Sequence, residues 1–196
     1  MNPRTFGVGL ALSLSLAAAH PALAQEYDEA AGMAAYEKAM TPGEQHAKLA
    51  ELEGTWAMTV TSWMQPGAEP TVTEATSKSK MVMGGRYLHD SVEGTAMGMP
   101  FTGMGWTGYN NAAERYEATW IDNFGTGILT THGQWDDEAG GIVMSGSYTD
   151  PITGTKTKVK TVSRMEGPDK SIFTWYEKAE GAEEGRKTME IVSIRQ

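Results

Sequence analysis

From Gly54 onward, polar and apolar residues alternate with a period of two, which is typical of β-strands that have one solvated face. Clusters of Gly, Pro, Asn and Asp interrupt this pattern at regular intervals and predict hairpin turns. The predicted strands cover residues 55–64, 71–83, 86–95, 101–109, 116–122, 127–135, 142–148, 156–165, 172–178 and 187–195. We predict an all-β fold, an antiparallel up-and-down β-barrel of about ten strands, because closure removes exposed sheet edges. A two-sheet sandwich is the alternative.

Two helices are predicted before the first strand. In residues 41–53, Thr41 is a good N-cap, Pro42 suits the first helical position, and Glu44 completes a capping box. Gly54 can adopt a left-handed conformation after the helix, and Trp56 opens the strand pattern.

A weaker helix is predicted over residues 25–40, where Tyr27, Ala31, Ala34 and Met40 share one face. Such an N-terminal arm either packs on the outside of the domain or forms a lid over a cavity mouth.

Residues 1–24 have the composition of a signal peptide. Arg4 gives a short positive region, residues 6–19 are apolar, and residues 22–24 form a small-x-small cleavage pattern. We predict cleavage after Ala24, with an uncleaved N-terminal anchor as the alternative. The expected organisation is a signal peptide (1–24), a helical arm (25–53) and a barrel domain (54–196) in the periplasm or outside the cell.

Charge and cysteine content limit the possible partners. The net charge of −9 becomes −10 after cleavage, because the removed segment contains Arg4 and no acidic residue. This acidity argues against nucleic acid and against an anionic membrane as partners. No segment after residue 24 is long and apolar enough to be predicted as a membrane span. The chain has no cysteine, which excludes disulfides and thiolate chemistry.

The barrel is expected to have an interior of some width. Charged residues occupy alternate positions in residues 73–80 and 156–160, so the opposite faces of these strands must line the inside. A ten-stranded barrel is wider than one of eight strands, whose interior side chains or one small ligand can fill. The abundant Trp, Tyr and Met residues can supply either a bulky filling or the walls of a cavity.

The start and end of the barrel domain resemble the calycin group, which includes lipocalins and fatty-acid-binding proteins. Gly54 and Trp56 match the glycine and tryptophan that open the first strand in that group. The resemblance implies that Arg195, on the last strand, packs across Trp56 as a cation–π pair. Ten strands are more similar to nitrobindin-type barrels than to the eight strands of lipocalins.

A closer resemblance covers most of the chain after the signal peptide. The matching segments, residues 41–46, 52–56, 83–88, 98–103, 108–110, 119–123 and 150–154, together resemble the bacterial family called domain of unknown function 1579. The resemblance implies a barrel-like domain that is often exported. It implies no activity.

Several residues are candidates for lining a ligand site. Asp122, which follows Trp120 at a strand end, either faces a ligand or caps the hairpin through its backbone. Arg86 is a candidate interior cation that would meet a ligand carboxylate or balance Asp122 or Glu93, and the alternative is an outward-facing arginine. The remaining candidates for the ligand site are Met104, Trp106, Trp120 and His132. Residues 103–108 spell G-x-G-x-x-G but lie within a predicted strand, so we expect no dinucleotide there.

No metal site or cofactor is assigned from the sequence. His89 and His132 lie on separate predicted strands without a second ligand at metal-binding spacing, so haem or metal binding stays an alternative. Met97, Met99 and Met104 offer thioethers to copper(I), but methionine is also the adaptable filler of apolar pockets.

The predicted function is binding of a small, mainly apolar molecule in the interior of an exported barrel. One alternative is an enzyme that uses Asp122 as a cavity acid with Arg86 or His132, although we find no G-x-S-x-G elbow, P-loop or zinc motif. The other alternative is a packed structural or interaction module. The oligomeric state is not predicted.

Overall fold

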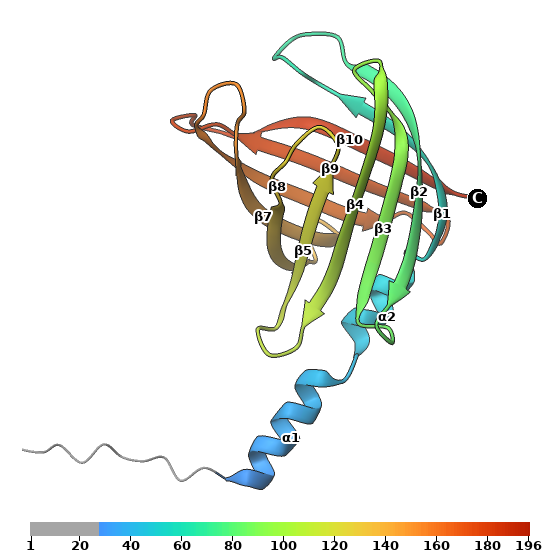
Figure 1. Cartoon of the computed structure of the whole chain (residues 1–196), viewed down its shortest axis with the longest axis vertical. Coiled ribbons are helices and arrows are strands. Elements are labelled where there is room, and N and C mark those ends of the chain that lie inside the picture. Colours follow the sequence, from blue (N-terminus) through green and yellow to red (C-terminus); the bar gives the residue numbers. More distant parts are fainter. Residues whose placement is uncertain (1–27) are drawn as a thin grey trace, which may run out of the picture.

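The computed structural model describes residues 28–196, and the predicted signal peptide lies outside this range. Two helices precede ten strands: α1 (Glu29–Met40), α2 (Glu44–Ala50), β1 (Gly54–Ser62), β2 (Thr71–Val82), β3 (Tyr87–Ala96), β4 (Met99–Asn110), β5 (Arg115–Asp122), β6 (Leu129–Asp136), β7 (Gly141–Thr149), β8 (Lys156–Met165), β9 (Lys170–Lys178) and β10 (Arg186–Arg195). Each strand pairs antiparallel with its neighbours in sequence, and β1 also pairs with β10, so the sheet closes into a barrel (Figure 1). The predicted ten-stranded up-and-down barrel is confirmed.

Helix α2 closes one end of the barrel. Leu49, on the inner side of α2, is 1% exposed and joins a core cluster with Leu88, Tyr116, Ile142 and Met144. Because α2 leads directly into β1, it lies at the end where β1 begins. The loops after β1, β3, β5, β7 and β9 gather at the opposite end, which is the upper end in Figure 1.

Helix α2 begins later than the sequence predicts. Its N-cap is Gly43, whose N–H donates to Nδ1 of His46 at 3.0 Å. Thr41 instead ends α1, because its hydroxyl donates to the carbonyl oxygen of Glu37 at 2.7 Å. A threonine hydroxyl can accept from a free N–H at the start of a helix or donate to a free carbonyl oxygen at its end. Here Thr41 donates to a carbonyl oxygen at the end of α1.

Helix α1 projects from the α2 end of the barrel and has no buried residue (Figure 1). The Asn111 side chain donates to the carbonyl oxygens of Lys38 and Thr41, and Arg86 donates to that of Met40. These contacts hold α1 at the end away from the five loops. Helix α1 therefore lies outside the barrel at the α2 end, and it does not form a lid over the opposite end.

Arg195 fastens the last strand to the first one. Its guanidinium lies 4.1 Å from the centre of the Trp56 ring, as the resemblance to calycins implies. The same guanidinium donates to the backbone oxygens of Glu51, Glu53 and Pro168. Gly54 has a φ of 139°, and a Cβ there would lie 2.8 Å from the Arg195 guanidinium. A glycine is therefore needed both for the backbone conformation and for the space that Arg195 occupies.

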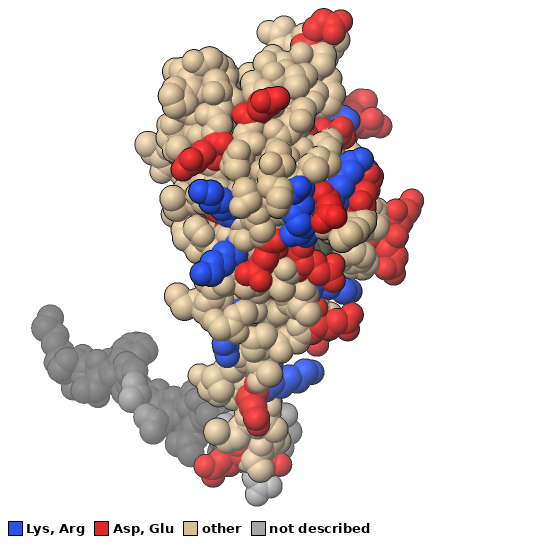
Figure 2. Space-filling view, turned by 90° about the vertical axis from the view of Figure 1, so that its right-hand side faces the viewer, with Lys and Arg blue, Asp and Glu red and all other residues tan. Residues whose placement is uncertain are grey.

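The outer wall carries both signs of charge. Figure 2 shows the face over β1 and β2, where Lys and Arg side chains alternate with Asp and Glu side chains. Such mixing on the outer wall gives this face no field of a single sign.

Candidate functional site

The register of the strands tells which side chains face the barrel axis. Cross-strand partners lie on the same face of a sheet, and the buried Trp56 pairs with Ser77 on β2 and Arg195 on β10. The row continues from Ser77 to Val92 on β3, to Gly103 on β4 and to Asp122 on β5. Asp122 therefore faces inward as well. The same procedure assigns every strand.

The inner face is tightly packed near α2 and less tightly packed along part of its opposite half. Near α2, the inward side chains of Trp56, Leu88 and Tyr116 are at most 3% exposed. Farther from α2, large inward side chains are only half-buried, namely Met58, Val60, Trp120, Phe173, Trp175 and Ile191. The opposite half is not uniformly open, because the inward Thr157 and Val159 of β8 are 5% and 2% exposed. The less tightly packed inward side chains belong to β1, β5, β9 and β10.

Trp120 is the central aromatic side chain of this less tightly packed region. Its indole lies against β4, where a Cβ on Gly103 would be 2.4 Å from the ring and one on Gly105 would be 3.0 Å from it. The two glycines of the G-x-G sequence therefore make room for an inward tryptophan. The indole N–H donates to Oδ2 of Asp122 at 2.9 Å. The other oxygen of Asp122 accepts from the backbone N–H of Phe124, so Asp122 both faces inward and caps its hairpin.

A second carboxylate faces inward from β9. Glu177 accepts hydrogen bonds from Tyr148 and from the indole of Trp175, both at 3.0 Å. Burial raises the pKa of Tyr148 to about 12, and the negative charge of Glu177 acts in the same direction. The phenol therefore remains a hydrogen-bond donor at neutral pH.

Asp90 is an inward acid that the sequence analysis did not select. It is half-buried on β3 and accepts a 2.5 Å hydrogen bond from the Ser79 hydroxyl, which is 3.4 Å from the hydroxyl of Ser77. Burial raises the pKa of Asp90, and the hydrogen bond from Ser79 opposes this shift. The sequence signal was weak, because Asp90 sits between a histidine and a serine in an otherwise ordinary strand.

We expect Asp90 to make the protein less stable as the pH rises. The folded-state pKa lies above the ordinary value of 3.8, so the folded chain holds this proton more tightly than the unfolded chain. Stability is then fully present below that ordinary value and is lost as the pH rises through the folded pKa. The loss amounts to about 1.4 kcal/mol for each pH unit between the two pKa values.

Urea unfolding of the Asp90→Asn variant at acidic and neutral pH checks this expectation. The variant should lose this part of the pH dependence, whereas Glu93→Gln, on the outer face of the same strand, should keep it. Parallel pH profiles for wild type and Asp90→Asn would contradict the assignment.

Two of the buried hydroxyls in the interior have no partner among the described residues. Tyr116 and Thr161 are 1% and 3% exposed, and neither hydroxyl has a hydrogen-bond partner within residues 28–196. Both belong to one cross-strand row that runs through Gly133 and Met144. Unpaired buried hydroxyls are costly unless water or a bound molecule satisfies them.

The other candidates from the sequence lie elsewhere. Arg86 is exposed in the turn after β2, at the α2 end, and its guanidinium donates to backbone oxygens of Met83 and Met40. His132 is exposed on the outer wall, where it pairs across strands with Glu117. The proposed pairing of Asp122 with Arg86 or His132 is therefore not formed, because these side chains occupy different ends or opposite faces of the sheet.

Met104 and Trp106 also lie on the outer wall, each 39% exposed. Trp106 packs against His89, with ring centres 4.9 Å apart. Both residues alternate with Gly103 and Gly105, which face inward, so they cannot line the interior.

Within residues 28–196, no three His, Asp or Glu side chains are grouped as metal ligands. His89 and His132 both face outward, and Met97 and Met99 are exposed at the end of the barrel opposite α2. The part of the chain that the structure describes contains no helix long and apolar enough to cross a membrane.

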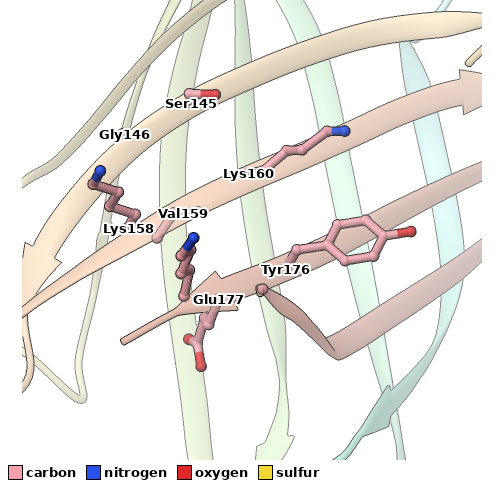
Figure 3. A pocket seen from close by; sticks show the side chains of 9 residues that line it. Ser145, Gly146, Lys158, Val159, Lys160, Tyr176 and Glu177 are labelled. Carbon is pink, nitrogen blue, oxygen red and sulfur yellow. The ribbon is translucent and has the colours of Figure 1, made fainter. Parts of the chain in front are cut away.

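Two hollows lie outside the barrel axis. One, of about 340 Å³, lies along β7, β8 and β9, where Lys158, Lys160 and Tyr176 share the outward register (Figure 3). The other, of about 600 Å³, lies between α1 and the β4–β5 turn and includes Tyr109 and Asn111.

Comparison with known proteins supports the fold and identifies the family. The crystal structure of Rv2717c from M. tuberculosis matches with a TM-score of 0.59 and 17% identity, over 80% of this chain and 99% of that chain. At this identity the likeness concerns the fold alone. No curated protein matched the chain. Residues 41–195, which comprise α2 and the barrel, match the family described as protein of unknown function (DUF1579). The chain is therefore a member of the DUF1579 family.

Proposed function

We propose that the barrel binds a small, mainly apolar molecule through the end opposite α2. The observation that carries this proposal is the contrast between the two ends of the inner face. Trp56 and Tyr116 are fully buried near α2, whereas Val60, Trp120 and Trp175 face the axis and remain half-buried. A domain that needed only a packed core would gain free energy by burying these three side chains completely.

The polar groups narrow the kind of ligand. Asp122 and Glu177 accept hydrogen bonds from the indoles of Trp120 and Trp175, respectively, and lie beside these half-buried side chains. Deeper inside, the unpaired hydroxyls of Tyr116 and Thr161 can each donate or accept. This arrangement suits an apolar body with one or two polar groups, at least one of which donates hydrogen bonds.

Native mass spectrometry of the protein purified from its own host, without refolding, tests the proposal. We expect a reproducible extra mass that is released on denaturation. The same spectrum tests the proposed export, because a processed chain would begin at Gln25.

A matched pair of variants locates the binding site. In Val60→Trp, an inward half-exposed side chain becomes a bulky ring, and the extra mass should disappear. In Thr59→Trp, the adjacent outward position changes, and the extra mass should persist. An apo mass for the wild type, unchanged by a panel of lipids, haem and copper, would instead favour a packed interaction module.

A further inference from the structure

The loops at the end opposite α2 carry exposed apolar side chains. Four of the five loops carry one, and we call these four side chains the rim tips: Met64, Met97, Ile128 and Ile152. Their exposed fractions are 66%, 65%, 70% and 92%. The loops that carry them gather at the end of the barrel opposite α2 (Figure 1). Each side chain comes from a different hairpin, so the rim tips are distributed around this mouth.

The fifth loop differs in character. Residues 179–185, between β9 and β10, carry Glu180, Glu183 and Glu184 and no large apolar side chain. The apolar part of the rim is therefore interrupted on one side, between β9 and β10.

A basic patch lies on the outer wall behind Ile152. Lys156, Lys158 and Lys160 project outward from β8, and Lys178 pairs across strands with Lys158. None of these four lysines forms a salt bridge with an acidic side chain of residues 28–196, although Lys178 donates to the backbone oxygen of Glu183. The protein as a whole is acidic, which on average argues against an anionic membrane, so four lysines on two adjacent strands are a local exception to that expectation.

The hollow of Figure 3 lies within this basic patch. Its volume is about 340 Å³, and Lys158, Lys160 and Lys178 line it together with Tyr176 and Ser145. Glu177, Val159, Gly146 and Gly185 complete the lining, so the groups that suit a phosphate here are the ammonium groups of the three lysines.

We propose that this end of the barrel docks on a phospholipid bilayer, with the rim tips inserted and the lysines of the basic patch in contact with lipid phosphates. Apolar side chains on separate tips suit a soft planar partner, because each tip can insert independently without a complementary surface. Strand β8 follows the loop that carries Ile152, so its outward lysines lie next to the inserted tips and extend their ammonium groups toward the headgroup layer. The biological role of this docking rests on the proposed function, because docking would place the mouth of the barrel next to a membrane that supplies apolar ligands.

Flotation of the protein with phosphatidylcholine vesicles, with and without phosphatidylglycerol, tests this docking. The protein is purified from its host, and its N-terminus is verified by mass so that no signal peptide contributes to binding. We expect the wild type to float with both kinds of vesicle. The Ile128→Ser, Ile152→Ser double variant should bind at least about tenfold more weakly to both.

Two further variants make the result specific. Lys158→Gln with Lys160→Gln should remove the extra binding that phosphatidylglycerol gives while leaving most binding to phosphatidylcholine. Met33→Ser with Tyr36→Ser removes two side chains of α1, each 62% exposed at the other end of the molecule, and should float like the wild type. Loss of flotation in the α1 variant, normal flotation of the rim variant, or no flotation of the wild type would each overturn the proposal. A failure here would leave the native mass spectrum unchanged, so the two proposals fail separately.

Discussion

Replacing Leu49 with alanine is expected to lower the free energy of unfolding by about 3 kcal/mol. Leu49 is 1% exposed and carries the contact of α2 with Leu88, Tyr116, Ile142 and Met144. Truncation removes buried apolar surface and leaves a cavity between a helix and a closed sheet. The ladder around the barrel is continuous, so the strands cannot move inward to fill that cavity.

Urea unfolding at equilibrium measures this loss. Leu49→Met should cost much less, because it keeps most of the volume. Ile152→Ala, at a position 92% exposed, should change the stability by less than about 0.5 kcal/mol. It also tests whether changes at the rim leave the fold intact. A small effect for Leu49→Ala would mean that α2 does not contribute to the core as its burial indicates.

Replacing Arg195 with alanine should lower the free energy of unfolding by about 2 kcal/mol. The guanidinium covers the Trp56 ring at 4.1 Å and is about one quarter exposed. Its N–H groups also donate hydrogen bonds to the carbonyl oxygens of Glu51 and Glu53, which follow α2, and to that of Pro168 in the turn after β8. One side chain thus joins the helix, the first strand and the last strand.

Two control variants separate charge from geometry. Arg195→Lys keeps a cation but cannot make the same set of forked hydrogen bonds, so it should lose an intermediate amount of stability. Arg164→Ala removes an exposed ion pair with Glu166 and should have no measurable effect. Equal stabilities of Arg195→Lys and wild type would show that the positive charge alone is sufficient.

The end opposite α2 and the rim give the two proposals a common geometry. The half-buried aromatic side chains lie inside the mouth, and the rim tips surround it. The acids Asp122 and Glu177 face the interior, whereas the lysines of the basic patch face outward. A ligand and a bilayer would therefore meet different chemical groups, and variants of one set should leave the other set unchanged.

The sequence alone determined the ten strands and favoured a barrel over a sandwich, whereas the pairing of β1 with β10 that closes the barrel is seen only in the structure. Period-two alternation and turn residues predicted ten strands near their observed bounds, because these signals depend only on neighbours along the chain. Gly54, Trp56 and Arg195 were also identified correctly as a structural set. They were identified because they match the pattern of the calycin group, and the structure then showed the contact of Arg195 with Trp56.

Only the tertiary structure decided which side chains meet inside. A period of two tells that neighbours face opposite ways, but not which set faces inward, so Met104 and Trp106 were placed inside although Gly103 and Gly105 face the axis. Arg86 was expected to balance an interior acid, and instead it holds the end of α1.

Asp90 shows most clearly how strand pairing, rather than the local sequence, determines the surroundings of an inward side chain. Its neighbours Ser79 and Gly105 come from strands on either side, and the sequence gives no sign that they enclose a carboxyl group. Strand pairing joins residues that are far apart in the chain, and the burial that raises the pKa of Asp90 exists only once the barrel has closed.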